Sequence, residues 1–446
     1  MFSKSKLNFL YHLFQWLQIF FNQWKSSDGL LRLQNTKLRK VVSHAYANVS
    51  YYRKLFDSLG IKPKDIASMR DLVKIPILTK DIILANYPDK ILAAGVDWKH
   101  CSPRMTSGSS GKKLQVVLDL NVAAQYRMMQ LRQLIDVGYK PWDRIVYIRY
   151  APPVTKVVLQ KLGLFRRYYV PLEWPPERQL SEILRFKPQI INAYPSVLHL
   201  LARTVTRDQA KKLRLKFLLS NSELLTRHIR ESLEEVFQCK VYDDYSCLEF
   251  SAIAFECRMQ SLHIASDNVI VEILDGDGNQ LPPGEQGRIV ITALNNYAMP
   301  YIRYEIGDIG ILSDEICPCG RRFPVLKSIV GRCDDFVVMP SGRLIDPQTA
   351  VFQIEVIPEV KEFRVIQGKD YKITVNIIPQ EGAEFVRIED QIKKKLGSVF
   401  NDSLRVDVNQ VSILERGTTG KHRSVISHIA RVGYKDSYLP SLLRGG

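Results

Sequence analysis

The sequence lacks the features that mark several large classes of protein. It contains no internal repeat and no low-complexity segment, which argues against a solenoid or a disordered linker. Its hydrophobic fraction of 46% and charged fraction of 24% are ordinary for a globular protein. With 446 residues, the chain is long enough for two or three domains, or for one large domain and a small one.

Cysteine is scarce and unevenly placed. The chain has seven cysteines, an odd number without the regular spacing of a disulfide framework. This distribution argues against a secreted, disulfide-bonded scaffold and favours a reducing compartment. We therefore expect a cytoplasmic protein.

Acidic residues are the minority among the charged side chains. Asp and Glu number 46 against 63 Lys and Arg, which gives a formal net charge of +17. A basic surface suits an anionic substrate such as a nucleotide, and it also suits an anionic membrane. Zinc-finger spacing, an RNA-binding signature and long Lys/Arg runs are absent from the sequence, so we expect no nucleic-acid partner.

An uninterrupted apolar run long enough to cross a membrane is also missing. Residues 7–24 are apolar and aromatic but are interrupted by polar side chains, namely Asn8, His12, Gln15, Gln18 and Asn22. The segment has no small-residue cleavage site, which disfavours a signal peptide. An amphipathic helix on a membrane surface fits the pattern, and a helix packed on its own domain fits it equally. Both alternatives stay open for residues 1–26.

Beyond residue 104 the pattern alternates between short β-rich runs and helical stretches. We predict strands at 114–118, 145–150, 189–192 and 217–220, and helices at 123–137 and 225–237. Strands that alternate with helices indicate an α/β fold with a substantial parallel sheet.

After residue 262 the pattern becomes β-rich. We predict strands at 269–274, 287–293 and 309–313, with a turn at 275–278, where the sequence reads Asp-Gly-Asp-Gly. Further strands at 362–366, 372–378 and 404–408 and a helix at 385–396 are enough for a small α+β domain. We place the boundary near Asp334. The expected divisions are an N-terminal segment 1–26, a large domain 27–333 and a small domain 334–446.

The strongest local motif is a loop rich in glycine and hydroxyl side chains. It consists of Thr106, Ser107, Gly108, Ser109, Ser110, Gly111 and Lys112. Glycine lets a backbone approach a ligand, and amide and hydroxyl groups donate hydrogen bonds to phosphate oxygens. The spacing is neither that of a Walker A loop nor Gly-x-Gly-x-x-Gly. Taken alone, the loop is better explained as a flexible turn.

Further motifs follow this loop in order. They are Tyr245-Ser246-Cys247-Leu248-Glu249, the stretch from Tyr301 to Asp308, Gly331-Arg332-Cys333-Asp334-Asp335 with Gly342, and Gly420-Lys421. With these motifs the chain resembles the adenylate-forming superfamily of acyl-CoA synthetases, luciferases and peptide-synthetase adenylation domains. Within it, the chain is similar to the phenylacetate–CoA ligase family, including its CapK-like members. The resemblance runs through most of the chain.

The resemblance implies a fold and a reaction. The fold would be a large adenylate-forming domain, with parallel sheets and a β-rich subdomain, followed by a small mobile α+β lid. The reaction would activate a carboxylic acid with ATP and Mg²⁺ to an acyl-AMP and pass the acyl group to coenzyme A. Transfer to a sugar or an amine, as in polysaccharide biosynthesis, and a catalytically inactive scaffold remain as alternatives. The acid pocket is expected to include parts of 147–150 and 192–196.

The resemblance also implies roles for the motif residues. The loop Thr106–Lys112 would hold the β- and γ-phosphates, Ser222 and Glu223 would border the adenine, and Tyr245 would stack on it. Glu249 would bind Mg²⁺, Asp308 the ribose hydroxyls, and Arg332 the ribose or a phosphate. Asp334 would be the hinge, Gly342 would line the coenzyme A tunnel, and Lys421 would reach the α-phosphate and the acyl carboxylate. The expected catalytic residues are therefore Lys421, Glu249 and Arg332.

A zinc site is a separate hypothesis. Cys257 and His263 are close in sequence, and Cys317 and Cys319 flank Pro318. One Cys₃His set satisfies a tetrahedral Zn²⁺ ion, although four buried, unliganded side chains are the alternative. Some relatives in the phenylacetate–CoA ligase family carry the same pattern, so we expect structural zinc.

Overall fold

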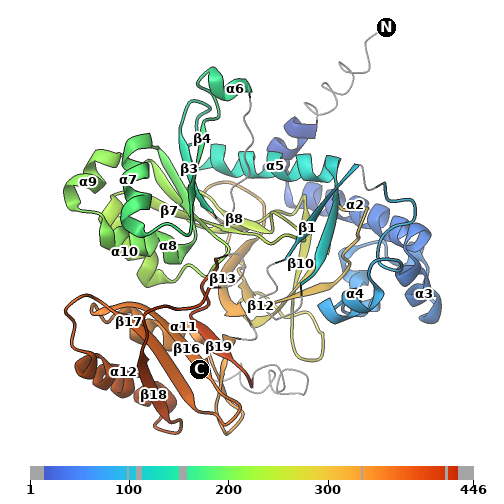
Figure 1. Ribbon diagram of the computed structural model, residues 1–446. Helices are drawn as coiled ribbons and strands as arrows, with labels where there is room; N and C mark the ends of the chain where they lie inside the picture. The colour runs from blue at the N-terminus through green and yellow to red at the C-terminus, as the bar shows by residue number, and fades with distance from the viewer. Residues whose placement is uncertain are drawn as a thin grey trace. The chain divides into compact units, whose positions relative to one another are not determined.

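The computed structural model describes residues 15–97, 100–106, 113–149, 158–332, 335–416 and 420–429 (Figure 1). The chain divides into two compact units. Unit 1 comprises Met1–Gly138, Asp244–Ile306 and Gly310–Ser328, and unit 2 comprises Tyr139–Asp243, Gly307–Ile309 and Ile329–Gly446. The predicted α/β class is confirmed, because strands and helices alternate through most of the chain.

The first lobe of unit 2 is a parallel sheet with helices between its strands. Its strand order is β7-β6-β5-β3-β4, and β3 pairs in parallel with both β4 and β5, as β5 does with β6. The strands are β3 (Ile145–Arg149), β4 (Arg167–Pro171), β5 (Ile190–Ala193), β6 (Phe217–Asn221) and β7 (Lys240–Tyr245). The helices are α6 (Val158–Lys161), α7 (Pro176–Phe186), α8 (Pro195–Thr204), α9 (Arg207–Leu213) and α10 (Arg227–Phe237).

Local sequence explains why these helices begin where they do. Thr226 caps α10 by accepting a hydrogen bond from the Ile229 amide, and α8 has a proline at its first position. Alternate strand residues then pack with the apolar faces of α7, α8 and α10 in one core. The strand residues of this core include Val146, Ile148, Ile191, Leu218 and Val241.

The second lobe of unit 2 has its own sheet and core, drawn in orange and red in Figure 1. The strand order is β18-β17-β16-β19. β17 is antiparallel to β16 and parallel to β18. The elements are β14 (Val337–Val338), β15 (Leu344–Ile345), α11 (Pro347–Glu355), β16 (Val360–Gln367), β17 (Ile373–Pro379), α12 (Phe385–Phe400), β18 (Val406–Gln410) and β19 (Val425–Ser427).

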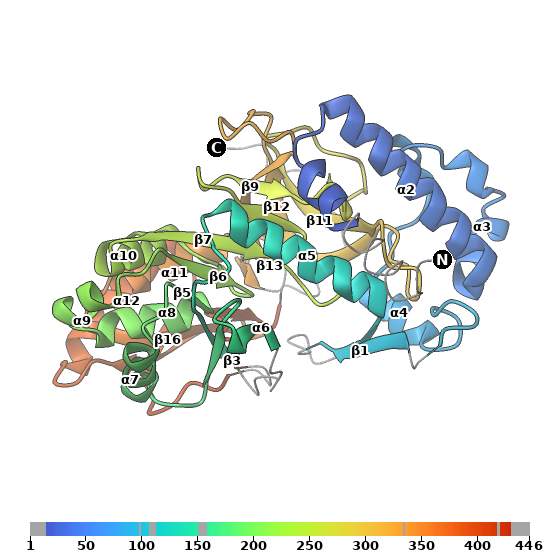
Figure 2. The same cartoon turned by 90° about the horizontal axis from the view of Figure 1, so that it is seen from above.

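Unit 1 combines helices with mainly antiparallel strands. Helices α2 and α3 lie side by side in both views (Figures 1 and 2). The helices are α2 (Ser27–Asn48), α3 (Ser50–Ser58), η1 (Pro63–Asp65), η2 (Met69–Lys74), α4 (Lys80–Asn86) and α5 (Leu120–Asp136). The strands are β1 (Cys101–Met105), β2 (Gln115–Asp119), β8 (Ala254–Glu256), β9 (Leu262–Ile264), β10 (Val269–Leu274), β11 (Gln286–Ala293), β12 (Tyr304–Leu312) and β13 (Val325–Arg332), of which β12 and β13 run partly into unit 2.

The N-terminal segment is helical over residues 15–22 and packs on unit 1. Asn22 is buried and donates a hydrogen bond to the Asp267 carboxylate. Arg132 donates to the same carboxylate at 2.8 Å and to the backbone carbonyl of Ile19 at 2.6 Å. Because the Arg132 and Asp267 side chains are both fully buried, this ion pair fixes the helix firmly in place. Packing on its own domain is therefore observed for this part of the segment.

Apolar side chains are exposed on the same helix and in the turn that directly follows it. Leu17, Phe21 and Trp24 are 40%, 58% and 46% exposed. Among the described residues, no helix is both long enough and apolar enough to span a bilayer. Contact with a membrane surface stays a prediction.

The boundary predicted at Asp334 falls on a residue outside the described part of the chain. The division into 1–26, 27–333 and 334–446 also stays a prediction. A separate hydrophobic core for residues 337–425 agrees with a small C-terminal domain.

Candidate active site

A polar cluster lies where strands β3, β5 and β6 end. Parallel strands place their carboxyl ends at one edge of the sheet, the edge where α/β proteins bind ligands. Arg149 ends β3, and its guanidinium donates hydrogen bonds to the side-chain oxygens of Asn192 and Asn221. The Asn221 amide in turn donates to Asn192 at 2.9 Å. The edge of the sheet therefore carries a connected set of hydrogen-bonding groups.

The loop after β6 joins this cluster to the C-terminal segment. Ser222 has a φ of +69°, a backbone conformation that is strained for a residue other than glycine and that concentrates at functional sites. Its hydroxyl donates to the Asn221 side-chain oxygen at 3.1 Å. The Glu223 carboxylate accepts hydrogen bonds from the backbone amides of Ser196 at 3.2 Å and His422 at 2.6 Å. Residues 196, 223 and 422 are thus held together by one side chain.

Two opposing effects set the charge state of Glu223. Burial raises the pKa of its carboxyl group, because a charged group loses hydration there. The hydrogen bonds from His422 and Ser196 lower the pKa again, because they stabilise the charged form. The net result is a pKa above the ordinary value for glutamate.

Lys421 lies in the segment that Glu223 holds. Gly420 has a φ of +74° and packs so closely on Leu172 that a Cβ atom would overlap that side chain. The His422 ring lies 2.9 Å from the Phe363 carbonyl, and burial lowers the pKa of the ring to about 3. The backbone next to Lys421 therefore lies beside the loop of Ser222 and Glu223, and the roles expected of these residues stay predictions.

Asp308 and Arg332 are brought together on neighbouring segments of unit 2. Asp308 lies on β12 directly after Gly307, and Arg332 ends β13. The Arg332 Nε atom is 3.9 Å from an Asp308 carboxylate oxygen, the long limit for an ion pair. The roles expected of these two side chains toward the ribose and the phosphates stay predictions.

Of the residues expected to bind the nucleotide or Mg²⁺, three that the structure describes belong to unit 1. Thr106 closes the base of the glycine-rich loop, because its amide and hydroxyl both pair with the Leu114 backbone at 2.9 Å. The rest of that loop, residues 107–112, lies outside the described residues. Tyr245 ends β7, where its carbonyl accepts from the Ile253 amide. Glu249 is buried, and its negative charge adds to burial in raising the pKa of Tyr301.

Gly342 has a clear local role. It has a φ of +83° in the turn between β14 and β15, where its amide donates to the Met339 carbonyl at 2.8 Å. A left-handed turn of this kind favours glycine whatever the function. The expected roles of Gly342 in a tunnel and of Asp334 as a hinge therefore stay predictions.

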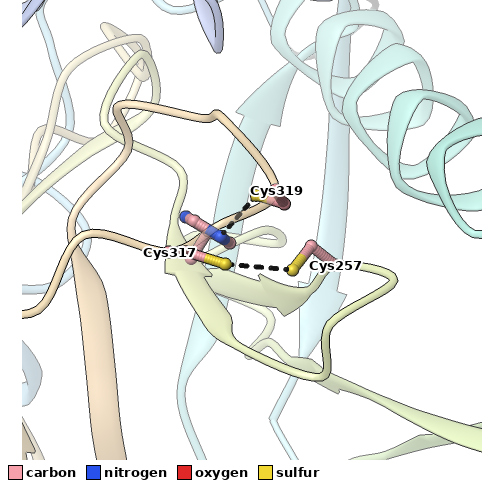
Figure 3. A group of neighbouring side chains, drawn as sticks. Cys257, Cys317 and Cys319 are labelled. Carbon is pink, nitrogen blue, oxygen red and sulfur yellow. Dashed lines mark hydrogen bonds between the residues drawn. The ribbon is translucent and has the colours of Figure 1, made fainter.

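The four residues of the zinc hypothesis form one cluster in unit 1. Cys257, His263, Cys317 and Cys319 each offer a ligand atom, and all four atoms lie within 4.8 Å of one another. Figure 3 shows the three cysteines pointing toward a common centre. Of the four residues, all but Cys319 are buried.

The spacing of these atoms fits a tetrahedral ion. Zn–S bonds of about 2.3 Å place two sulfurs about 3.8 Å apart. The Cys257 and Cys317 sulfurs are 3.7 Å apart, and the Cys319 sulfur is 3.3 Å from His263 Nε2. His263 Nδ1 lies 2.8 Å from the Phe323 carbonyl oxygen, which can only accept a hydrogen bond. Nδ1 must therefore be the donor, and Nε2 is left to bind a metal.

Some of these relationships were missed by sequence reasoning. Arg149 lies within the range 147–150 expected for the acid pocket, but its hydrogen bond to Asn221 was not foreseen, nor was the bond from His422 to Glu223. Both bonds join residues far apart in the chain. A usable signal was present for Asn221, because it directly precedes the Ser222-Glu223 motif at the end of a predicted strand. Tyr150, from the expected pocket, lies outside the described residues.

Comparisons with known proteins identify similar chains. The family model described as AMP-binding enzyme matches residues 160–301. The chain is 29% identical over 357 residues to a phenylacetate-coenzyme A ligase of Thermus thermophilus, covering 77% of this chain and 79% of the relative. It is 22% identical over 433 residues to protein CapK of Staphylococcus aureus, covering 91% of each. A solved 2-hydroxyisobutyryl-CoA ligase in the postadenylation state, in complex with 2-HIB-AMP, has the same fold. It gives a TM-score of 0.75 at 20% identity over 91% of each chain.

Proposed function

We propose that this chain, which carries an AMP-binding domain and is similar to phenylacetate–CoA ligases and to CapK, is an adenylate-forming enzyme that activates a carboxylic acid with ATP and transfers the acyl group to coenzyme A. The observation that carries the proposal is the position of Lys421 beside Glu223. The hydrogen bond of 2.6 Å from the His422 amide to Glu223 holds the lysine segment at the loop proposed to border the adenine. Thus an expected catalytic lysine and an expected nucleotide loop meet in one place.

The reaction has two steps. In the first, a carboxylate oxygen bonds to the α-phosphorus of ATP, the bond to the β-phosphate breaks, and pyrophosphate leaves. Two anions approach each other in this step, so a cation must offset their repulsion. Lys421 supplies one positive charge, and Glu249 is the proposed ligand for Mg²⁺, which supplies more. In the second step the thiol of coenzyme A attacks the acyl carbonyl and AMP leaves.

The remaining motif residues have proposed binding roles. Tyr245 stacks on the adenine, Asp308 accepts hydrogen bonds from the ribose hydroxyls, and Arg332 contacts the ribose or a phosphate. The loop Thr106–Lys112 holds the β- and γ-phosphates. Asp334 serves as the hinge of the small domain, and Gly342 lines the coenzyme A tunnel.

Product analysis tests the reaction and its acceptor. Purified protein is incubated with ATP, Mg²⁺ and a panel of acids, with and without coenzyme A, and the products are identified by mass spectrometry. We expect an acyl-CoA thioester that requires all four components. Similarity to CapK motivates a second candidate, transfer to a sugar or an amine. Acyl-AMP that accumulates regardless of coenzyme A would favour that candidate, and no acyl-AMP with any acid would contradict both.

We also propose that Cys257, His263, Cys317 and Cys319 hold a structural zinc ion. The support is the spacing of four ligand atoms and the carbonyl that orients His263. Metal analysis of the purified protein should give close to one zinc per chain. Cys317→Ser should lose the metal, and Cys239→Ser, outside the cluster, should keep it. A chain that contains no zinc when purified without chelators would contradict the site.

The exposed side chains of Leu17, Phe21 and Trp24 support a further proposal, peripheral contact with an anionic membrane. The net charge of +17 would add electrostatic attraction. In a flotation assay with anionic vesicles, Phe21→Ser and Trp24→Ser together should reduce binding. Leu162→Ser, which changes an exposed leucine in unit 2, is the control. Equal flotation of all three proteins would mean that the segment serves only for packing.

A further inference from the structure

Four parallel strands of unit 2 begin side by side at one edge of their sheet. The first residues of β3 and β4, Ile145 and Arg167, are in register, as are the first residues of β3 and β5 and those of β5 and β6. Backbone hydrogen bonds extend this alignment beyond the strands: the Gln189 amide donates to the Arg144 carbonyl at 3.0 Å, and the Lys216 amide donates to the Gln189 carbonyl at 2.8 Å. The segments that lead into the strands therefore lie next to one another. We call them the amino edge, which consists of residues 140–144, 164–167, 187–189 and 214–216.

The amino edge is strongly basic. Its Lys and Arg residues are Lys140, Arg144, Arg166, Arg167, Lys187, Arg214 and Lys216. Its one acidic residue is Asp143, whose carboxylate is buried and already paired. Lys216 Nζ donates to both of its oxygens at 2.8 Å, and the Lys140 amide donates to it at 2.7 Å.

The remaining cations are spread along the whole edge. An exposed Lys or Arg precedes or begins each of the four strands, namely Lys140, Arg167, Lys187 and Arg214. Neighbouring strands lie about 4.8 Å apart, so the four strands span about 14 Å. Scattered positions in the sequence thus form one positively charged surface, which attracts an anionic partner.

An exposed indole accompanies these cations. Trp142 lies in the turn before β3 and is 61% exposed. Its carbonyl accepts a hydrogen bond of 2.9 Å from the Arg166 guanidinium, and the Phe165 amide donates to the carbonyl of Pro141. These bonds hold Trp142 at the amino edge. An indole beside Lys and Arg side chains is typical of surfaces that bind at the boundary between membrane and water.

Two classes of partner suit a basic surface with an aromatic side chain. Single-stranded nucleic acid binds in basic grooves in which several aromatic rings stack on successive bases. The segments of the amino edge carry one exposed aromatic side chain, Trp142, which fits a flat anionic surface better. We propose that the amino edge is a docking surface for a membrane that contains anionic phospholipid, with Trp142 at the level of the headgroups.

Docking at this edge would leave the candidate active site of unit 2 uncovered. Arg149, Asn192 and Asn221 lie at or next to the carboxyl ends of the same strands, at the opposite edge of the sheet. The proposal concerns attachment and does not depend on the reaction. It also differs from the contact proposed for Phe21 and Trp24, which belong to unit 1.

Vesicle flotation of the full chain tests the proposal. The vesicles contain phosphatidylcholine alone or phosphatidylcholine with phosphatidylglycerol. We expect binding to the anionic vesicles that weakens as the salt concentration rises. Lys140→Gln, Arg167→Gln, Lys187→Gln and Arg214→Gln together should lower the partition coefficient by about 10²–10³-fold, because each cation near an anionic surface contributes about a fivefold factor. Trp142→Ser alone should lower it by about tenfold, because the indole loses its apolar environment.

A matched variant separates a local surface from the effect of net charge. It removes four exposed cations from the second lobe of unit 2, through Lys361→Gln, Lys369→Gln, Arg387→Gln and Lys394→Gln. This variant should bind nearly as well as the wild type, and the midpoint of thermal unfolding verifies that each variant is folded. Equal losses in the two fourfold variants would overturn the proposal.

Other outcomes would overturn it without the fourfold variants. One is a wild-type protein that does not bind anionic vesicles, and another is unchanged binding in Trp142→Ser. Single-stranded DNA serves as the competing partner. Binding of DNA in place of vesicles, lost when the cations of the amino edge are removed, would assign this surface to nucleic acid.

Discussion

Glu223 offers the sharpest test of how the two lobes of unit 2 cooperate. Its carboxylate accepts one amide hydrogen bond from Ser196 in the first lobe and one from His422 in the second. Glu223→Gln keeps the shape of the side chain but replaces one oxygen by an NH₂ group, which cannot accept. One hydrogen bond to a charged acceptor is lost, and one pair of donors is left facing each other.

The size of the effect follows from these contacts. Hydrogen bonds to charged groups contribute about 1.5–3 kcal/mol, which corresponds to about a 10- to 150-fold change in an equilibrium. Docking of the Lys421 segment should weaken by this factor, so the rate of acyl-AMP formation should fall by about 10- to 150-fold. Thioester formation from chemically prepared acyl-AMP and coenzyme A does not need Lys421 at the α-phosphate. It should change by less than about threefold, within ordinary surface-mutation effects.

Rapid-quench measurement of each half-reaction gives both rates. Glu177→Gln, an exposed glutamate in the first turn of α7, is the matched control and should leave both unchanged. Equal losses in the two half-reactions would refute the reasoning, because they would mean that Glu223 only binds the adenine, which both steps use.

Three further predictions concern stability. Burial raises the pKa of Glu355 to about 7, so the folded protein binds more protons than the unfolded chain between about pH 4.5 and 7. The free energy of unfolding should therefore fall by up to about 3 kcal/mol as the pH rises through this window. The midpoint of thermal unfolding should show this decline between about pH 5 and 8 in the wild type and should lack it in Glu355→Gln. Arg132→Met removes the ion-pair partner of the fully buried Asp267 and leaves that carboxylate only the hydrogen bond from Asn22 and the nearby charge of Lys37, which should cost up to about 3–5 kcal/mol and lower the midpoint of thermal unfolding by several degrees. Zinc removal should speed tryptic cleavage after the exposed Lys25. The reason is that Arg321 closely follows the Cys317–Cys319 loop and donates a hydrogen bond of 3.0 Å to Gln23, at the end of the N-terminal helix. An unchanged cleavage rate after chelation would contradict this coupling.

Locally encoded elements could be predicted well from the sequence. The strand predicted at 269–274 is β10, and the helix predicted at 385–396 is α12, which continues to Phe400. The helix predicted from 123 begins earlier, at Leu120, because Asp119 caps it by accepting from the Val122 amide. The strand β4 was not predicted, although Tyr168, Tyr169 and Val170 are strand-forming residues. In each case the residues that indicate the element lie within about ten positions of it in the chain.

Long-range contacts could not be predicted in the same way. The hydrogen bond from Arg149 to Asn221 spans 72 residues and that from His422 to Glu223 spans 199. Such pairs depend on strand order and on the docking of a lobe, neither of which local periodicity encodes. The cluster of Cys257, His263, Cys317 and Cys319 could be predicted because the chemistry of zinc binding restricts the choice to a few residue types, and the clustering of these side chains agrees with that prediction. Bound zinc itself stays a prediction. The roles assigned to Asp334 and Gly342 derive from the family resemblance and remain to be measured.

Acid-dependent exchange of labelled pyrophosphate into ATP tests the central claim most directly, because only a reversible acyl-AMP step produces it. With an acid from the panel, the wild-type protein should catalyse exchange that requires Mg²⁺. Lys421→Ala should reduce the rate by about 10²–10³-fold, the usual effect of losing one preorganised electrostatic contact. Lys361→Ala, which removes an exposed lysine from β16, should not reduce it. Wild-type exchange that is absent with every acid, or that is unchanged in Lys421→Ala, would contradict the account.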